Sequence, residues 1–382
     1  MQQLYYVRKR KLQWRDVPPP VLLTSADALV RPIAAARCDL DNAFLLRNMT
    51  PALRVGLALH MLDPLVKDTL GLPAFEGPFP YGHECVAEIT ELGSDVTGFS
   101  VGDIVIVPFQ LSCGHCGSCR IDLTAHCETD RTTPIKAFGF GNATGDLGGM
   151  VTDLFRVPNA QHMLVKVPHG IAPATVASAS DNIADGWRTV APHLAARPGA
   201  PVLVLGGRAK SVSLYAVAAA VALGSTQVDF VDASDERLQI ATALGARAIK
   251  LDTSYKKLMG SHLLRENGYP ITVDGSGAVA GLDFAIRSLS VGGICTTVAF
   301  YLRAGTPVPL WRMYVHGGTL KTGLANVRAD LPDILEAVQS GRLRPELVTT
   351  LTADWHDAPE ALLDPTTKVV LIRPPLAIPI LN

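Results

Sequence analysis

Four cysteines in one short stretch constrain this chain more than any other feature. In the segment 113–127, CGHCGSCRIDLTAHC, two residues separate each of the first three cysteines and seven separate the third from the fourth. Zinc binds four thiolates in a tetrahedron at about 2.3 Å. Three ligands on a tight loop supply one face of the tetrahedron and the fourth closes it. The spacing therefore predicts a closed structural zinc site with the ligands Cys113, Cys116, Cys119 and Cys127. The alternatives are two disulfides or a chance clustering of cysteines.

The composition indicates a large globular enzyme. The chain has 382 residues, of which 48% are apolar and 18% charged, and this length suggests two or three domains. Its 34 basic and 35 acidic side chains give no electrostatic argument for a nucleic-acid partner. No run reaches the ~20 apolar residues that a membrane span needs, and the N-terminus lacks the apolar core of a signal peptide. Cysteines clustered for metal indicate a reducing compartment, so we expect a cytoplasmic protein.

The pattern of the chain changes near residue 174. Before it, short strand-like runs between glycine turns, at 28–33, 85–90 and 104–107, predict a β-rich small barrel. An alanine-rich segment with helical spacing covers 174–195. Beyond it, apolar strands alternate with helices, which predicts a doubly wound dinucleotide-binding sheet. Its predicted elements cover 201–206, 211–223, 228–232, 235–244, 271–274 and 293–298, and a helix at 331–340 and a strand at 368–372 follow in the tail.

One segment, 48–78, stands apart. It contains an apolar run with few charges and helical spacing, at 52–62. The run is interpreted as an ordinary buried helix, as a lid over a substrate pocket or as a subunit contact.

Three other segments carry residues of metal-ligand type: Cys38, the pair His83 and Glu84, and Asp181. A catalytic zinc takes three protein ligands and leaves a fourth position for water or substrate. Each residue alone is a weak signal, because a lone cysteine is usually a small hydrophobe and an aspartate before a helix is usually a cap. One thiolate, one imidazole and one carboxylate together would form a neutral divalent site, which makes the metal a strong Lewis acid.

The order of these motifs, with Gly82 before His83, the cysteine loop and then a Rossmann half, resembles the zinc-dependent medium-chain alcohol dehydrogenases over nearly the whole chain. The resemblance implies an α/β fold with a β-rich GroES-like catalytic barrel domain, containing the structural zinc lobe, at 1–183. A doubly wound Rossmann domain follows at 184–325. The segment 326–382 is expected to return to the catalytic domain.

The resemblance also implies roles for single residues. Cys38, His83 and Asp181 match the ligands of a catalytic zinc, and Glu84 matches a carboxylate that enters the metal shell in some states. Asp41 matches a carboxylate that orients the ligand histidine. The implied enzyme holds two zinc ions per subunit and transfers a hydride between NAD(H) and a small-molecule alcohol, aldehyde or ketone. It is expected to be a homodimer or homotetramer.

The phosphate loop departs from the family pattern G-x-G-x-x-G. This chain reads Gly206-Gly207-Arg208-Ala209-Lys210-Ser211, with Arg208 in place of the second glycine and Ser211 in place of the third. Arg208 either obstructs the loop or pairs with the pyrophosphate as a charged donor. In the pairing interpretation, Ser211 donates its hydroxyl near the helix N-terminus, where anions are favoured.

Further basic and acidic residues complete the predicted cofactor site. Asp232 ends the second strand, where an acid bonds the ribose hydroxyls and repels a 2′-phosphate, so NAD is expected and NADP is less favoured. A helix cap is the alternative role for Asp232. Arg237 lines the adenosine pocket or lies on a solvated helix face, and Lys368 matches a basic position that touches the pyrophosphate in the family.

The predicted proton relay also departs from the family. Leu40 occupies the position where relatives carry serine or threonine, two residues after the zinc cysteine. A leucine cannot carry a proton. This departure, with the altered phosphate loop, leaves a second hypothesis open: a zinc protein of the same fold whose redox activity is lost or redirected, acting as a non-redox enzyme or binding scaffold.

Overall fold

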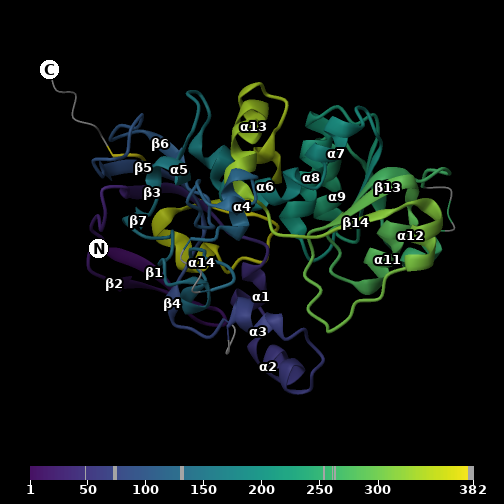
Figure 1. Ribbon diagram of the computed structural model, residues 1–382, viewed down its shortest axis with the longest axis horizontal. Coiled ribbons are helices and arrows are strands. Elements are labelled where there is room, and N and C mark those ends of the chain that lie inside the picture. Colours follow the sequence, from purple (N-terminus) through teal and green to yellow (C-terminus); the bar gives the residue numbers. More distant parts are fainter. Residues whose placement is uncertain are drawn as a thin grey trace. The chain divides into compact units, whose positions relative to one another are not determined.

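The computed structural model describes residues 1–47, 49–71, 75–129, 133–252, 254–259, 261 and 264–376. Figure 1 shows the ribbon and labels many of its elements. The chain forms two compact units. The first comprises Met1–Asp181, Asn326–Leu335 and Thr349 onward, and the second comprises Asn182–Ala325 and Glu336–Val348. The sequence assigns the whole tail 326–382 to the first domain, whereas the structure groups Glu336–Val348 with the second unit.

The first unit is built from two largely antiparallel sheets. One has the strand order β2-β1-β4, and the other has the order β15-β16-β3-β5-β6-β8, with β7 also paired to β3. The strands are β1 (Gln2–Arg8), β2 (Lys11–Asp16), β3 (Ala28–Ala36), β4 (Phe79–Pro80), β5 (Glu84–Leu92), β6 (Ile104–Ile106), β7 (Phe155–Val157), β8 (Val165–Lys166), β15 (Leu351–Asp354) and β16 (Val369–Ile372).

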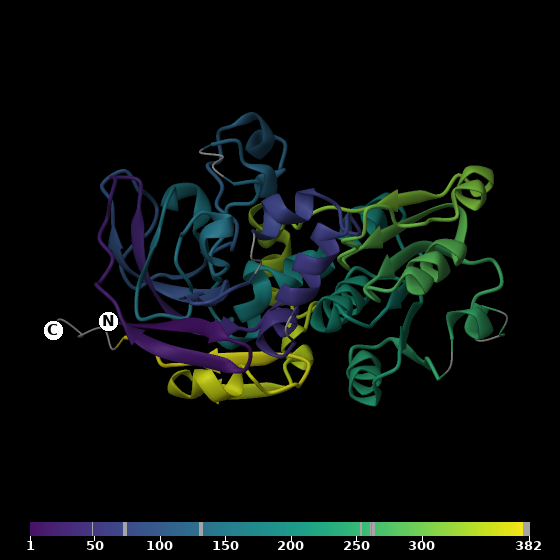
Figure 2. The ribbon, with the colours of Figure 1, turned by 90° about the horizontal axis from the view of Figure 1, so that it is seen from below.

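Strand register gathers one end of the larger sheet. β3 pairs antiparallel with β5, placing Ala36 opposite Glu84, and with β16, placing Ala36 opposite Val370. The residues just beyond these positions, Cys38 and Lys368, therefore lie at the same end of the sheet as Glu84. The C-terminal elements also lie beside β2, where the Trp14 and Trp355 rings are 6.4 Å apart (Figure 2).

Short helices connect these strands. They are α1 (Asp41–Leu45), α2 (Thr50–Ala58), α3 (Leu65–Leu70), α4 (Gly117–Arg120), α5 (Ala160–Met163) and α14 (Ala358–Ala361), with the 3-10 helices η1 (Thr124–His126), η2 (Gly141–Thr144), η3 (Pro173–Ser180) and η5 (Trp355–Asp357). The interpretation of 52–62 as an ordinary buried helix is wrong. In α2 only Leu53 and Gly56 are buried, whereas Val55, Leu59 and Met61 are more than half exposed.

The second unit contains the doubly wound sheet. Its six strands are all parallel, in the order β11-β10-β9-β12-β13-β14. The strands are β9 (Val202–Leu205), β10 (Val228–Asp232), β11 (Arg247–Lys250), β12 (Tyr269–Asp274), β13 (Leu289–Thr297) and β14 (Thr319–Lys321). The helices are α6 (Asn182–Trp187), α7 (Ala191–Ala196), α8 (Lys210–Ala222), α9 (Asp235–Ala243), α10 (Tyr255–Met259), α11 (Val279–Arg287) and α12 (Leu310–His316), with η4 (Pro345–Val348); α13 (Val327–Gln339) runs through both units.

Helices cover both faces of this sheet, so its central strands β9 and β12 are almost completely buried. All four residues of β9 are buried. Leu203 and Leu205 share one core with residues of α10 and α11. Helix α8 is buried nearly all round, from Ser211 to Ala220, and this explains the run of small and apolar residues that it carries.

The alanine-rich segment 174–195 is not one helix. The structure divides it into η3, α6 and α7. η3 is already kinked at Val176, and a break follows at Asp181, whose backbone is non-helical (φ −155°, ψ −81°). Local helix propensity yields here to tertiary contacts. The break turns the Asp181 side chain away from the helical path and into the buried site described next.

Candidate metal centres and cofactor site

The four clustered cysteines lie on a small lobe of the first unit. Cys116 caps α4, its sulfur accepting from the Cys119 N–H, and Cys127 directly follows η1. The four Sγ atoms all lie within 4.8 Å of one another. Sulfurs bound to one zinc ion at 2.3 Å lie ~3.8 Å apart, so the arrangement fits a tetrahedral metal. All seven cysteines of the chain are free thiols, so the structure does not adopt the disulfide alternative.

Hydrogen bonds favour the thiolate form of Cys113 in this lobe. The N–H groups of His115 and Cys116 donate to Cys113 Sγ at 3.4 and 3.3 Å. Burial raises the pKa of Cys113, but these bonds and one from the Thr129 side chain outweigh it and bring the pKa to about 6. Burial raises the pKa of Cys119 to about 12. Four adjacent thiolates would need a cation, and this donor set suits a zinc ion.

A second set of ligand-type side chains meets at the end of the larger sheet. Cys38 follows β3, His83 precedes β5, and Asp181 follows η3; one ligand atom from each lies within 4.8 Å of the others. All three residues are buried. Gly82 has φ +97°, and a Cβ there would lie 2.5 Å from Val151 Cγ2, so a glycine is needed at the turn that presents His83.

The His83 ring fits a metal ligand. Nε2 lies 3.3 Å from Asp181 Oδ2 and Nδ1 lies 3.9 Å from Asp41 Oδ1. Neither nitrogen makes a hydrogen bond of good geometry within the described part of the chain, although both are buried. Burial lowers the pKa of His83, but the carboxylates of Asp41 and Asp181 outweigh it and raise the pKa. Buried polar atoms are rarely left unpaired, so a cation between thiolate, imidazole and carboxylate suits this donor set.

Asp41 is held in place from two further sides. Its Oδ2 accepts from the Tyr81 hydroxyl at 2.6 Å and from the Cys38 N–H at 3.2 Å. Both Asp41 and Tyr81 are buried. The carboxylate thus faces His83 on one side and fixes the backbone of Cys38 on the other, an arrangement that orients ligands around a metal. The sequence contains no signal that marks Tyr81.

Glu84 and Lys368 form a buried pair beside this set. Lys368 Nζ donates to Glu84 Oε2 at 2.7 Å and to the Arg37 carbonyl at 2.8 Å, and the Ser178 hydroxyl donates to the same Glu84 oxygen at 3.1 Å. Burial raises the pKa of Glu84 to about 7, even though Lys368 lowers it. Lys368 is completely buried, and its described contacts belong to this network; contact with a pyrophosphate stays a prediction.

Aromatic rings surround His83. The centroid of Phe140 lies 4.4 Å and that of Phe109 5.5 Å from the His83 ring. Phe75, from the segment 48–78, continues this cluster at 6.5 Å from Phe140 and stacks on Phe44 at 4.9 Å. The apolar side of the site therefore includes Phe75, a residue of the segment 48–78.

The altered phosphate loop lies between β9 and α8. Gly206 is packed directly against the Asp232 carboxylate, because a Cβ at that position would overlap Oδ2. Arg208 is exposed. The Ser211 side chain takes a different position from the predicted one: it is completely buried and its hydroxyl donates to Asn182 Oδ1 at 3.0 Å. Ser211 therefore contributes to the packing of α8 on α6 and is not presented to an anion.

Asp232 forms a closed ion pair with Arg237. Arg237 Nε donates to Oδ2 at 2.8 Å and Nη2 to Oδ1 at 2.6 Å, and the Ser234 N–H donates to Oδ1 at 2.7 Å. Asp232 is not the N-cap of α9, because the hydroxyl of Ser234 caps that helix. Arg237 does not lie on a solvated face, since its side chain is only 14% exposed.

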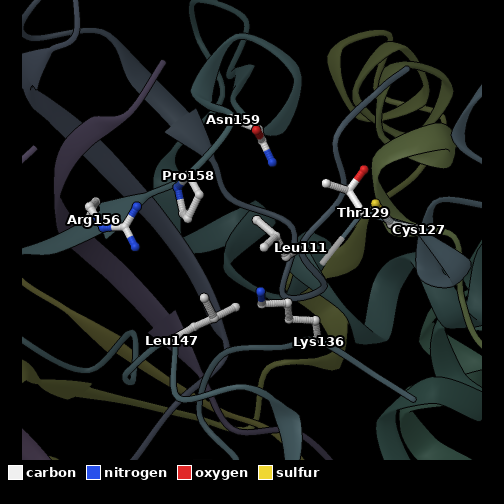
Figure 3. A pocket seen from close by; sticks show the side chains of 8 residues that line it. All are labelled: Leu111, Cys127, Thr129, Lys136, Leu147, Arg156, Pro158 and Asn159. Carbon is white, nitrogen blue, oxygen red and sulfur yellow. The ribbon is translucent and has the colours of Figure 1, made fainter. Parts of the chain in front are cut away.

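A cavity of about 260 Å³ lies beside the cysteine lobe. Lys136, Arg156 and Asn159 point nitrogen atoms toward it, and Leu111, Leu147 and Pro158 supply apolar walls (Figure 3). Arg156 is also paired with the buried Asp27 at 3.0 Å. Cys127 lines the same cavity, so cationic groups lie near the thiolate lobe.

The described helices include none with the length and apolar character that a bilayer span demands.

Comparison with known proteins agrees with this architecture. Residues 25–169 match the alcohol dehydrogenase GroES-like domain. A probable zinc-binding alcohol dehydrogenase of Mycobacterium tuberculosis is 30% identical over 294 residues, which cover 74% of this chain and 72% of that protein. A formaldehyde dismutase of Pseudomonas putida is 33% identical over 182 residues, covering 45% of this chain and 44% of that protein.

The solved structures give the same fold. The alcohol dehydrogenase of Thermus sp. ATN1 superimposes with a TM-score of 0.79 at 26% identity, over 97% of this chain and 99% of that chain. The predicted combination of a GroES-like domain with a Rossmann domain is thereby confirmed. The chain belongs to the zinc-dependent medium-chain alcohol dehydrogenase family of oxidoreductases.

Proposed function

We propose that this protein transfers a hydride between NAD(H) and an alcohol, aldehyde or ketone, with a catalytic zinc held by Cys38, His83 and Asp181. The observation that carries the proposal is the buried His83 ring, whose nitrogens lie between two carboxylates without a good hydrogen bond in the described residues. When bound there, zinc would supply Lewis acidity that lowers the pKa of a substrate hydroxyl, and NAD would supply the hydride acceptor.

The protein's own side chains prepare this site. Asp41 faces the ring of His83 at 3.9 Å and accepts a hydrogen bond from the backbone N–H of Cys38. The Leu40 N–H donates to Cys38 Sγ at 3.4 Å. Burial and the carboxylates of Asp181 and Asp41 raise the pKa of the Cys38 thiol, so a cation is needed to hold Cys38 as a thiolate. Glu84, with its raised pKa and its bond to Lys368, is the group beside the ligands that can gain or lose a proton near neutral pH.

The four-cysteine lobe is proposed to hold a second, structural zinc. Its donor set is complete without water or substrate, which is the mark of a structural site. Metal analysis of the purified protein should therefore give two zinc ions per chain. A value of one zinc ion per chain would contradict the proposal that the protein has two zinc sites.

NAD is the proposed cofactor, supported by Asp232 at the end of β10. The ion pair with Arg237 offsets part of the charge that repels a 2′-phosphate, so the preference over NADP is expected to be moderate. Titration with NADH and NADPH, followed by cofactor fluorescence, tests both the binding and the preference. An absence of saturable binding would reject the proposal.

The second candidate is a zinc protein of the same fold with lost or redirected redox activity. Arg208 in the phosphate loop and Leu40 after the zinc cysteine favour it. The two candidates separate in one experiment. The oxidoreductase binds NADH and consumes its absorbance at 340 nm with an aldehyde or ketone, or produces this absorbance from NAD⁺ with an alcohol. The second candidate keeps both zinc ions but shows neither binding nor a change of absorbance.

A homodimer is the proposed assembly. β14 is an edge strand in the described sheet, and no residue of the neighbouring helix α12 is buried. Leu310 and Trp311 of this helix are 67% and 76% exposed, as is Val291 at 79%. An open edge with apolar neighbours is a common site of association. Light scattering on wild type and Trp311→Glu tests the proposed dimer, with a monomeric variant as the expected result.

A cytoplasmic location is also proposed, and the free thiols support it.

A further inference from the structure

A buried carboxylate lies at the carboxyl end of β12, close to the altered phosphate loop. Asp274 is completely buried. Its Oδ1 accepts from the Ser276 N–H at 3.1 Å and hydroxyl at 2.6 Å, and its Oδ2 accepts from the hydroxyls of Thr297 at 3.0 Å and Tyr301 at 2.6 Å. Four donors satisfy the charge without a cation. Asp274 therefore joins the end of β12, the end of β13 and the segment that follows β13.

The loop that Asp274 anchors, Gly275–Ala278, packs on the phosphate loop backbone to backbone. The Arg208 N–H donates to the Ser276 carbonyl at 3.3 Å, and the Ala209 N–H donates to the Gly275 carbonyl at 3.0 Å. A Cβ at Gly207 would lie 2.7 Å from Ser276 Cα. The path of the phosphate loop is thus determined by its neighbour.

Gly277 accommodates the side chain that replaces the second glycine of the motif. Gly277 has φ +64°, and a Cβ there would lie 2.6 Å from Arg208 Cδ and 3.0 Å from Cγ. The stem of Arg208 thus lies over the bare backbone of Gly277. The guanidinium has no hydrogen bond or ion pair that the described residues supply, and Arg208 is exposed.

We propose that the loop Gly275–Ala278, anchored by Asp274, is the second half of the cofactor's phosphate site and that Gly277 positions Arg208 to pair with the pyrophosphate. This inference rests on the proposed NAD-linked function. The missing glycine at position 208 is compensated by a glycine on the adjacent loop, so the arginine adds a charged donor without blocking the site. Asp274 and Gly277 are positioning residues that act through Arg208 and the loop.

A double-mutant cycle on the zinc-loaded protein tests the pairing. Arg208→Gly should weaken NADH binding about ten- to hundredfold, the loss expected for one charge-assisted hydrogen bond. Gly277→Ala should weaken binding about tenfold in the wild-type background, because the new Cβ displaces the arginine stem. In the Arg208→Gly background, Gly277→Ala should have no further effect on NADH affinity.

Gly317→Ala is the matched control for backbone strain. Gly317 has φ +61°, nearly the value at Gly277, but a Cβ there meets no atom within 4 Å. Both alanine variants should lower the melting temperature to a similar extent. Only Gly277→Ala should change the dissociation constant for NADH.

Tyr301→Phe tests the anchor separately by removing one donor to Asp274. We expect a higher KM for NADH with an unchanged KM for the aldehyde or ketone and unchanged zinc content. Tyr5→Phe, in the first unit, serves as the control and should change neither KM.

The outcomes separate this inference from the proposed function. If wild type shows no saturable NADH binding, the proposed function fails. If wild type binds NADH but Gly277→Ala weakens binding equally with and without Arg208, the positioning role is wrong. Tighter binding by Arg208→Gly would also overturn it, because the arginine would then be an obstruction.

Discussion

The two cysteine-containing ligand sets are built in opposite ways. The lobe of Cys113, Cys116, Cys119 and Cys127 draws all its ligands from one loop, and backbone N–H groups bond its sulfurs. The set of Cys38, His83 and Asp181 draws on segments from residue 38 to residue 181 and is supported by buried side chains. A closed, inert site can thus be made locally, whereas a site for chemistry depends on the register of a whole sheet.

The largest expected difference follows from replacing one cysteine in each set. Cys38→Ser should abolish turnover and leave the fold intact, because the sheet that surrounds it does not depend on the metal. Cys116→Ser should lower the free energy of unfolding by several kcal/mol, a part of the ~10–16 kcal/mol that structural zinc contributes in small domains. Thermal melts, zinc content and turnover, measured together, check both variants. If Cys38→Ser and Cys116→Ser lost the same amount of stability, the distinction between a catalytic and a structural ligand set would fail.

Removing support from the buried set should have an intermediate effect. Asp41→Asn keeps the size of the side chain but weakens its hold on His83, so we expect activity or zinc affinity to fall about 10- to 100-fold. Tyr81→Phe, which leaves the Asp41 charge in place, should cost less. Turnover and zinc retention against a chelator provide the measurement. If Tyr81→Phe proved the more damaging change, the carboxylate would not be the main support.

A smaller effect is expected in the second unit, where the pair of Asp232 and Arg237 is predicted to influence the preference for NADH over NADPH. Asp232→Ser removes an acid and releases Arg237 for a 2′-phosphate, so the ratio of NADPH to NADH affinity should rise roughly tenfold, or about 1.4 kcal/mol. Asp235→Ser, at the exposed start of the same helix, is the matched control, because within the described residues the ion-pair partner of Asp235 is Lys250 at the surface. If the ratio of NADPH to NADH affinity did not change in Asp232→Ser, Asp232 would have only a structural role.

The last test concerns a histidine whose surroundings are opposite to those of His83. Burial, with Lys321 and Arg197 nearby, lowers the pKa of His193 to about 4. Because the unfolded chain binds the proton near pH 6.5, this contribution to stability is complete above pH 6.5 and is lost as the pH falls toward 4. His193→Asn should flatten the pH dependence of the melting temperature in that window. In the control variant His60→Asn, which replaces an exposed histidine, the melting temperature should depend on pH as it does in wild type.

The sequence predicts the parts of the fold that depend on local pattern. The strands expected at 28–33, 228–232 and 271–274 lie within β3, β10 and β12, because apolar runs between turns are sufficient to indicate them. The cysteine spacing likewise points to a compact lobe. The structure also brings Cys38, His83 and Asp181 together, a juxtaposition that the sequence implies only through the family resemblance.

What the sequence misses depends on packing between distant segments. The break at Asp181 lies inside a segment of helical composition, and only its buried partners explain it. Ser211 looks like a loop hydroxyl, but close packing of α8 turns it toward Asn182. Gly277 carries no motif signal, since its role depends on Arg208 in another loop.

The contiguity of the cysteine lobe has a consequence for how such chains can diverge. All four sulfur ligands are encoded within the segment 113–127, so one insertion or deletion in a gene can add or remove the complete lobe. The ligands at 38, 83 and 181 have no such route, because each is encoded in a different stretch and must change separately. The lobe can therefore be gained or lost as one unit, whereas the buried set of Cys38, His83 and Asp181 can change only by separate substitutions.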